Sequence, residues 1–301
     1  MTDQSPEEYR CGFVAIAGRP NVGKSTLVNR ILGQELCIVT RKAQTTRNRI
    51  TAIHNLPHAQ LILLDTPGIH DAKTPLNLSM VQTAMKSLED ADAVLFMTTP
   101  SKEIPDDDRL ILESLKESNI TTILAINKID KIRPPELLPI IETYSQAYDF
   151  KEIFPISALY GASLTELIDA LIGMLPPGPP LYPLDDVSDL PVRFFVAEMI
   201  REQVTMLTGE EIPYKTAVVV ESFKERGSSI LIHADIHIER ASQKKILVGK
   251  GGKMIKRVGI AARKKIEEFL GCHVRLELFV KVTPHWTRDD AMLGEFGYQP
   301  R

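Results

Sequence analysis

One stretch decides the fold of this chain, namely Gly18-Arg19-Pro20-Asn21-Val22-Gly23-Lys24-Ser25-Thr26. It fits the pattern G-x-x-x-x-G-K-[ST], a glycine-rich loop whose backbone N–H groups surround phosphates. An apolar run, 13–17, precedes the loop, and apolar residues at helical spacing follow it over 26–32. A strand, a loop and a helix in this order predict a nucleotide site, with Lys24 on the β- and γ-phosphates and the Ser25 hydroxyl on Mg²⁺.

Length and composition limit what the rest of the chain can be. With 301 residues, 44% apolar and 25% charged, the sequence predicts two soluble domains with a sizeable core. A net charge of −3 means that any nucleic-acid site must come from local clustering of basic residues. Cys11, Cys37 and Cys272 are too few and too widely spaced for a disulfide framework or a zinc site, so a reducing compartment is expected. The polar segment 1–10 is not typical of a signal peptide, and no run of 18 apolar residues exists to cross a membrane.

The first half of the chain alternates strand and helix patterns, which predicts an α/β domain with a mostly parallel sheet. Five prolines in 176–183 cannot continue a helix and indicate a stiff, extended linker. We therefore expect a nucleotide-binding domain over 1–178 and a linker over 179–190. Expected strands cover 50–54, 60–64, 92–97, 121–126 and 152–156, the first two forming an antiparallel hairpin; expected helices cover 76–89, 106–117, 135–147 and 163–174.

The second half of the chain has a different order of helix and strand patterns. A helical pattern over 192–207 is followed by two β-rich runs, 216–223 and 229–238, that are separated by a hairpin signal. Two further helical patterns and an alternating strand over 274–282 complete the order α-β-β-α-α-β. We expect this domain to cover 191–285, with a C-terminal tail over 286–301 that packs on it.

Two motifs follow apolar strands in the first domain. The first, Asp65-Thr66-Pro67-Gly68, places a carboxylate where it can hold Mg²⁺ and an N–H where it can meet a γ-phosphate. In the second, Asn127-Lys128-Ile129-Asp130, the Asp130 carboxylate can accept two hydrogen bonds from guanine, a donor pair that adenine lacks. Lys128 would cover the base, and Asn127 would tie this loop to the phosphate loop.

Two weaker signals gain weight from their positions. Ser157-Ala158 follows the next strand, and the Ala158 N–H could donate to guanine O6. Gln44-Thr45-Thr46-Arg47 lies in the polar connection after the first helix, where a threonine hydroxyl could complete the Mg²⁺ shell when the γ-phosphate is present. We favour Thr46 for this role, and Thr45 remains an alternative.

The second domain carries a Gly-x-x-Gly loop, Gly249-Lys250-Gly251-Gly252, between two helical segments. Within the order α-β-β-α-α-β, this loop resembles that of type II KH domains, where backbone approaches single-stranded nucleotides closely. The segment 241–265 contains nine basic and no acidic residues, an electrostatic footprint for phosphates. The residues that we expect to bind RNA are Gly249, Lys250, Gly251, Gly252, Lys253, Lys256 and Arg257.

Taken in order and spacing, the motifs of the first domain resemble the five G-motifs of translation-factor-type GTPases. Three of them, over 18–26, 42–47 and 65–68, are very similar to those of the bacterial Era family, within the TrmE-Era-EngA-YihA-Septin-like superfamily, and the second domain fits as well. This resemblance implies a P-loop GTPase domain with a mixed six-stranded sheet plus an α+β KH domain. It also implies GTP or GDP and Mg²⁺ as ligands, and the single-stranded 3′ end of 16S rRNA as the partner.

The same resemblance implies a role in maturation of the 30S ribosomal subunit, as a monomer in the cytoplasm, with peripheral association at the inner face of the cell membrane and no DNA ligand. Ile69 follows Asp65-Thr66-Pro67-Gly68 where Ras-type enzymes place a water-orienting glutamine, so unaided hydrolysis should be slow. Related GTPases with a hydrophobic residue there use a K⁺ ion beside an asparagine that Asn21 matches. Two alternatives are an ATP-driven RNA remodelling enzyme, against which Asp130 argues, and a non-catalytic scaffold, against which Lys24, Ser25 and Asp65 argue.

Overall fold

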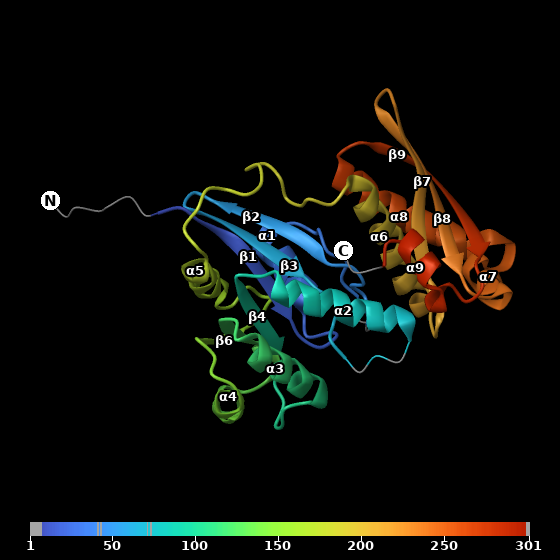
Figure 1. The fold of residues 1–301 in the computed structure, drawn as a ribbon. Helices are drawn as coiled ribbons and strands as arrows, with labels where there is room; N and C mark the ends of the chain where they lie inside the picture. Colours follow the sequence, from blue (N-terminus) through green and yellow to red (C-terminus); the bar gives the residue numbers. More distant parts are fainter. Residues whose placement is uncertain (1–7, 41, 43, 71, 73, 299–301) are drawn as a thin grey trace.

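A computed structural model describes residues 8–40, 42, 44–70, 72 and 74–298 of the chain. Figure 1 shows two domains, the first containing the larger sheet and the second containing the three strands nearest the C-terminus. The expectations for the first seven residues, at the start of the first domain, and for the last three residues of the tail lie outside the described residues. None of the helices described is long and apolar enough to span a bilayer.

The first domain is built on a six-stranded sheet in the order β2-β3-β1-β4-β5-β6. All neighbouring strands are parallel except β2 and β3, which pair as an antiparallel hairpin, as the sequence predicts. This order brings the carboxyl ends of β1, β3, β4 and β5 to one edge, where loops of an open α/β sheet form ligand sites. The strands are β1 (Arg10–Ala17), β2 (Ile50–Leu56), β3 (Ala59–Asp65), β4 (Ala93–Thr98), β5 (Thr122–Asn127) and β6 (Ile153–Ile156).

Helices cover both faces of this sheet because β1 is apolar on both sides. Val14 and Ile16 pack with α1 and α5, whereas Ala15 and Ala17 pack with α2, α3 and α4. The expected helices and strands all exist. Their ends differ from the expectation by at most two residues, except for the start of β1 and the end of the first strand of the second sheet, which differ by three. The helices are α1 (Lys24–Leu32), α2 (Pro75–Glu89), α3 (Asp106–Ser118), α4 (Pro134–Ala147) and α5 (Leu164–Met174), with a short 3₁₀ turn, η1 (Ile129–Lys131), after β5.

The second domain is a three-stranded sheet, β7-β8-β9, with three helices on one face (Figure 1). Strands β7 and β8 are antiparallel, and β8 and β9 are parallel, so the predicted order α-β-β-α-α-β is confirmed and has the topology of a type II KH domain. Alternate residues of β8, from Ile232 to Ile238, are fully buried under the helices. The elements are α6 (Val192–Leu207), η2 (Ile212–Lys215), β7 (Ala217–Arg226), β8 (Ser229–Ile238), α7 (Ala241–Val248), η3 (Lys250–Gly252), α8 (Lys253–Leu270) and β9 (His273–Val282).

The connection between α5 and α6 lies along the first domain instead of crossing solvent. The buried Gln60 side chain accepts hydrogen bonds from the N–H groups of Leu181 and Tyr182 at 2.8 and 2.9 Å. The Ile53 N–H of edge strand β2 donates to the Val187 carbonyl at 3.0 Å. These contacts fix the path of the proline-rich segment through side-chain and edge-strand hydrogen bonds.

The C-terminal tail contacts both domains, which the sequence does not predict. It contains η4 (Trp286–Arg288) and α9 (Asp290–Glu295), and Trp286 is fully buried. Trp286 and Tyr298 form one apolar cluster with Leu76 and Met80 of α2, on the first domain. The tail therefore packs against Ala217 and Val219 of β7 and also fastens this domain to α2.

Candidate functional site

The phosphate loop has the backbone geometry that its glycines allow. Gly18 and Gly23 have positive φ, and an added Cβ on Gly23 would lie 2.4 Å from the Asn127 amide nitrogen. The Lys24 ammonium group is buried and donates to the Gly18 carbonyl at 2.7 Å. Arg19 turns away from the loop toward α3, where its guanidinium contacts Asp108 at 3.3 Å. The Lys24 ammonium thus lies against the Gly18 and Arg19 carbonyls, inside the type of loop whose N–H groups bind phosphates.

Three oxygen-bearing side chains from separate segments meet beside Lys24. The Ser25 hydroxyl donates to Asp65 Oδ2 at 2.7 Å and lies 2.8 Å from the Thr46 hydroxyl. Asp65 is fully buried, and its other oxygen, Oδ1, has no hydrogen-bond partner within the described residues. The Thr45 hydroxyl lies away from this group and contacts Lys42 O at 2.8 Å. Thr46 is therefore the threonine that the structure brings to Ser25 and Asp65.

The loop after β5, residues 127–130, which we call the guanine loop, is tied to the phosphate loop through one side chain. The Asn127 amide donates to the Val22 carbonyl at 2.8 Å, and its oxygen accepts from the Ala158 N–H at 2.9 Å. The Lys128 ammonium group reaches the Asn21 carbonyl at 2.6 Å. The Ala158 N–H, which we expect to meet guanine O6, thus also supports Asn127.

Asp130, the residue that we expect to recognise guanine, is exposed to solvent at the end of this loop. Its carboxylate accepts from the Ser157 hydroxyl at 2.6 Å. Ser157 is buried, so it holds one carboxylate oxygen of Asp130 in place. The loops after β5 and β6 are therefore arranged around one carboxylate.

The segment after Asp65 lies close against the phosphate loop. An added Cβ on Gly68 would lie 2.6 Å from the Pro20 nitrogen, so only glycine fits there. Ile69 is buried in the core with its N–H on the Gly18 carbonyl at 3.3 Å, and an alkyl side chain cannot orient a water molecule by hydrogen bonding. The next residue, His70, contacts Gly68 O at 2.9 Å and the Gln44 amide at 3.1 Å. His70 therefore links the loops on either side of the phosphate site, a role that its sequence position does not reveal.

These loops enclose a cleft of about 510 Å³ at the carboxyl edge of the sheet. The first domain supplies its walls from the phosphate loop, from residues 38–40 and 44–46, and from the loop after β5. The lining residues include Gly23, Lys24, Ser25, Thr26, Gln44, Thr45, Thr46, Gly68, Lys128 and Lys131, of which the sequence reasoning missed Lys131.

The buried ammonium of Lys24 predicts a pH dependence of nucleotide binding. Burial lowers the pKa of Lys24 to about 8, although Asp65 and Asp108 act in the opposite direction. Anionic phosphates bind the charged form, so the protonated fraction falls from about 90% at pH 7 to about 10% at pH 9. We expect GDP affinity, measured calorimetrically without divalent metal, to weaken about tenfold over this range.

Lys24→Arg is the matched control, because arginine keeps its charge over the whole range. The pH dependence that remains in Lys24→Arg belongs to other groups, including the guanine base. An equal loss of affinity in both proteins would contradict the assignment to Lys24.

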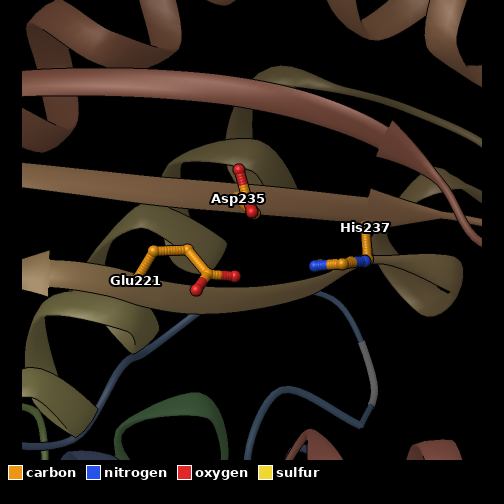
Figure 2. A group of neighbouring side chains, drawn as sticks. All are labelled: Glu221, Asp235 and His237. Carbon is orange, nitrogen blue, oxygen red and sulfur yellow. The ribbon is translucent and has the colours of Figure 1, made fainter.

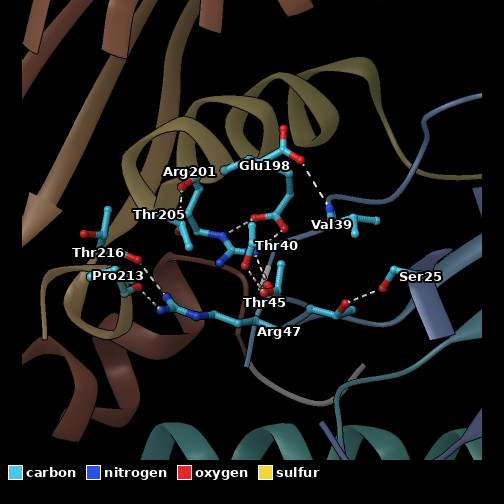
Figure 3. Close-up of polar contacts among 12 residues, drawn as sticks. Ser25, Val39, Thr40, Thr45, Arg47, Glu198, Arg201, Thr205, Pro213 and Thr216 are labelled. Carbon is cyan, nitrogen blue, oxygen red and sulfur yellow. Dashed lines mark hydrogen bonds and ion pairs between the residues drawn. The ribbon is translucent and has the colours of Figure 1, made fainter. Parts of the chain in front are cut away.

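The segment 38–47 also joins the two domains (Figure 3). Arg47 points away from the nucleotide cleft and donates to Pro213 O and Thr216 O of the KH domain at 2.8 and 2.7 Å. Its guanidinium also lies 5.9 Å from the centre of the Trp286 ring. On α6, Arg201 donates to the Thr45 carbonyl, next to Thr46. The same loop thus borders the nucleotide cleft on one side and α6 on the other.

Two lysines extend this contact between the domains. Lys42 donates to the carbonyls of Thr205 and Thr208 at the C-terminal end of α6, where a positive charge is favourable. Lys265 of α8 contacts Glu202 at 2.6 Å, and Glu202 accepts from the Val39 N–H at 3.2 Å. A chain of polar contacts therefore runs from the helix after the Gly-x-x-Gly loop to the edge of the nucleotide cleft.

The Gly-x-x-Gly loop lies between α7 and α8, as the sequence predicts. Gly249, Gly251 and Gly252 have positive φ, and an added Cβ on Gly249 would lie 2.8 Å from Met254 Cβ. Lys250 and Lys253 are exposed on the loop and at the start of α8, and Lys256 and Arg257 are exposed one turn further on. Backbone and positive charge are therefore presented together to solvent.

A groove of about 370 Å³ lies beside this loop, between α8 and β9. Its floor is apolar, from Ile255, Leu276 and Leu278, and its rim carries Arg263 and Arg275. An apolar floor with a basic rim suits unpaired bases attached to phosphates. The contribution of β9 was not predicted, because its alternating pattern indicates only a strand.

A second group of charged residues lies on the other face of the KH sheet, where Glu221, Asp235 and His237 are neighbours (Figure 2). These residue types could hold a metal. Lys281 already forms an ion pair with Asp235 and lies 4.0 Å from Glu221. Its ammonium group supplies the positive charge beside these carboxylates, so no metal ion is required there. Hydrogen bonding to Asp235 raises the pKa of Glu221. We interpret this group as an ion-pair network of the protein itself.

The fold and the cleft define a P-loop GTPase joined to a KH domain. Comparisons with known proteins agree, since the family described as "50S ribosome-binding GTPase" matches residues 13–128 and the family "KH domain" matches residues 211–287. The chain belongs to the Era family of GTPases. It is similar to GTPase Era of Geotalea uraniireducens (strain Rf4), with 50% identity over 97% of this chain and 99% of the relative, and to that of Lacticaseibacillus paracasei (strain ATCC 334), with 46% identity over 98% of each.

Two solved structures are similar over nearly the whole chain. An Aquifex aeolicus Era variant bound to GDP and aluminium fluoride has a TM-score of 0.93 and 42% identity, covering 96% of this chain and 99% of that one. Era in complex with MgGDPNP and nucleotides 1506–1542 of 16S ribosomal RNA has a TM-score of 0.94 and 43% identity, covering 97% and 99%. The chain is a GTPase, and the interpretations as an ATP-driven enzyme or a non-catalytic scaffold are not retained.

Proposed function

We propose that this GTPase is a nucleotide-controlled switch that binds the single-stranded 3′ end of 16S rRNA through its KH groove and assists maturation of the 30S subunit. One observation carries the proposal. The loop that brings Thr46 to Ser25 and Asp65 is the same loop that donates and accepts hydrogen bonds with the KH domain. The similar Era structures with GDP and aluminium fluoride, and with MgGDPNP and 16S rRNA nucleotides, support both ligands.

GTP and GDP are the proposed nucleotides, with Mg²⁺ as the metal. The donor set fits this metal, because hydroxyl and carboxylate oxygens are its preferred ligands and Asp65 Oδ1 is buried with no hydrogen-bond partner in the part of the chain that the structure describes. Ser25 and Thr46 would hold the ion, and Asp65 would hold it directly or through water. When bound, it would neutralise charge on the β- and γ-phosphates.

The residues of the chain itself would orient the triphosphate. The Lys24 ammonium and the backbone N–H groups of the loop supply fixed positive charge, and Asn127 keeps that loop in register with the guanine site. Since Ile69 is buried and cannot align water, hydrolysis should be slow unless another group assists. Slow hydrolysis suits a switch whose lifetime in the GTP state is set by its partner.

Potassium is the proposed assisting ion, beside Asn21. This residue has a φ of 64°, and its carbonyl accepts from Lys128 at the rim of the cleft. A cation near the phosphates would stabilise developing charge, so we expect about tenfold faster turnover in K⁺ than in Na⁺ at equal ionic strength. Phosphate release in the two buffers measures the ratio.

Asn21→Ala is the control for potassium, and it should bring the K⁺ rate down to the Na⁺ rate. Equal turnover of the original protein in both buffers would exclude a potassium site.

The RNA ligand is tested directly by binding. A fluorescent oligonucleotide with the sequence of the 16S rRNA 3′ end should bind the GTP-analogue form at least about tenfold more tightly than a scrambled strand or duplex DNA of equal length. Competition between GTP and ATP for the nucleotide site in the same assay tests which base that site prefers. Equal affinity for the scrambled strand would leave a general single-strand binder and refute the proposed partner.

We further propose that the protein acts as a monomer in the cytoplasm, with peripheral contact with the inner membrane face. The three free cysteines suit a reducing compartment. Membership of the Era family supports the association with the 30S subunit and the membrane face. Fractionation of cell extracts on sucrose gradients and with membranes tests both associations.

A further inference from the structure

We propose that the KH domain supplies a positioning residue for the GTPase site, namely Arg201. This residue lies on α6, outside the nucleotide-binding domain, and its guanidinium donates to the Thr45 carbonyl (Figure 3). Through that contact it would hold the Thr45–Thr46 peptide so that the Thr46 hydroxyl stays beside Ser25. The nucleotide site would then be fully formed only while α6 is docked.

The first supporting observation is that Arg201 is held rigidly. Glu198, one turn earlier on the same helix, accepts two hydrogen bonds from its guanidinium, at 2.7 and 2.6 Å. Only 1% of the Arg201 side chain is exposed, and Glu198 is nearly as buried. A guanidinium that is paired in this way has little conformational freedom, so the second N–H of its Nη2 is directed at the Thr45 carbonyl with a fixed geometry.

The second observation is how short the path to the metal site is. The Thr45 carbonyl and the Thr46 N–H belong to one planar peptide unit, so fixing the first restricts the second. The Thr46 hydroxyl lies 2.8 Å from Ser25 Oγ, which in turn donates to Asp65 at 2.7 Å. One hydrogen bond from α6 therefore acts on the group that is proposed to complete the Mg²⁺ shell.

The third observation is that neighbouring contacts hold the loop but do not replace Arg201. Val39 and Lys42 fix the start of the loop on α6, and Arg47 fixes its end on Pro213 and Thr216. Thr45 and Arg47 both adjoin Thr46 in the chain, but Arg47 makes its contacts through its side chain, whereas Arg201 holds the backbone carbonyl of Thr45. The inference rests on the proposed role of Thr46 as a metal ligand.

The test pairs two substitutions, Arg201→Met and Glu198→Gln, so that no unpaired carboxylate remains buried. Binding of a non-hydrolysable GTP analogue is titrated with Mg²⁺, and amide exchange of Thr46 is followed in the nucleotide-free protein. We expect about tenfold more Mg²⁺ for half-maximal binding and about tenfold faster exchange at Thr46. Arg201→Lys, which keeps a charged donor, should recover part of both effects and serves if the double variant fails to fold.

Ser79→Ala is the matched control, since it removes an interdomain hydrogen bond to Tyr298 O that lies away from the cleft. Ser79→Ala should leave the Mg²⁺ requirement within about twofold of that of the unchanged protein. This result would separate positioning of Thr46 from a general loosening of the contact between the domains. In the Thr46→Ala background, the Arg201 and Glu198 changes should have no further effect on the Mg²⁺ requirement.

The outcomes separate the inference from the function on which it rests. Two results would overturn the positioning role alone, and in both of them Thr46→Ala raises the Mg²⁺ requirement. In the first, the Arg201 and Glu198 variant leaves the Mg²⁺ requirement unchanged. In the second, its effect adds to that of Thr46→Ala. A normal Mg²⁺ requirement in Thr46→Ala would overturn the proposed metal ligand and the positioning role together.

Discussion

Asp130→Asn is expected to weaken GTP binding by about a thousandfold and to create a preference for xanthosine triphosphate. The carboxylate can accept from the two guanine donors, N1–H and the exocyclic amine, whereas an amide presents one acceptor and one donor group. Xanthine has a carbonyl in place of the amine, so it matches the amide. Competition of each triphosphate against a fluorescent GTP analogue measures both affinities.

The control for Asp130 is its partner in the loop. Ser157→Ala removes the hydroxyl that holds one carboxylate oxygen at 2.6 Å but leaves the carboxylate itself, so it should weaken GTP binding by only about tenfold and keep the base preference. Unchanged binding of the RNA oligonucleotide shows that the Asp130→Asn protein is folded. If that protein still prefers GTP, the base is recognised elsewhere.

Gly252→Asp is expected to reduce affinity for the single-stranded RNA by about a hundredfold. Gly252 precedes α8 with a φ of 75°, and an added Cβ there meets nothing within 4 Å. The fold should therefore accept the side chain at a cost of about 1 kcal/mol for the left-handed backbone. A carboxylate between Lys250 and Lys253 would repel phosphates that approach the loop.

Gly252→Asn separates charge from shape, because it has nearly the same size and tolerates the same backbone. We expect Gly252→Asn to lose only about tenfold in affinity for RNA. The difference in affinity between the Asp and Asn variants should disappear at high salt. Equal losses for the two variants at every salt concentration would show that steric exclusion, not charge, decides RNA binding at this loop. Thermal unfolding of both variants checks that the KH domain is intact.

Local sequence signals predict most of the fold because each depends on neighbouring residues. The glycines around Lys24 define the phosphate loop, and the alternation along 274–282 defines the last strand. The order α-β-β-α-α-β is likewise a sum of local patterns. The antiparallel pair β2 and β3 was predictable because a short turn leaves no other pairing.

The contacts between the domains could not be predicted in the same way. Arg47 reads as part of a polar loop, yet it is buried and its partners lie more than 160 residues further along the chain. Arg201 reads as the polar side of an amphipathic helix, and its partner outside that helix is a backbone carbonyl, which leaves no trace in the sequence. The tail was expected on the KH domain alone, because nothing near Trp286 indicates that α2 is its neighbour. Such pairs depend on how two finished domains meet.

The central claim is that guanine nucleotide and RNA are linked through the loop that α6 holds. The most direct measurement is the dissociation constant of the 16S rRNA 3′-end oligonucleotide for the protein saturated with GDP or with a non-hydrolysable GTP analogue. We expect at least about fivefold tighter binding with the GTP analogue. Identical dissociation constants in the two nucleotide states would show that the bound nucleotide does not control RNA binding, which would contradict the claim.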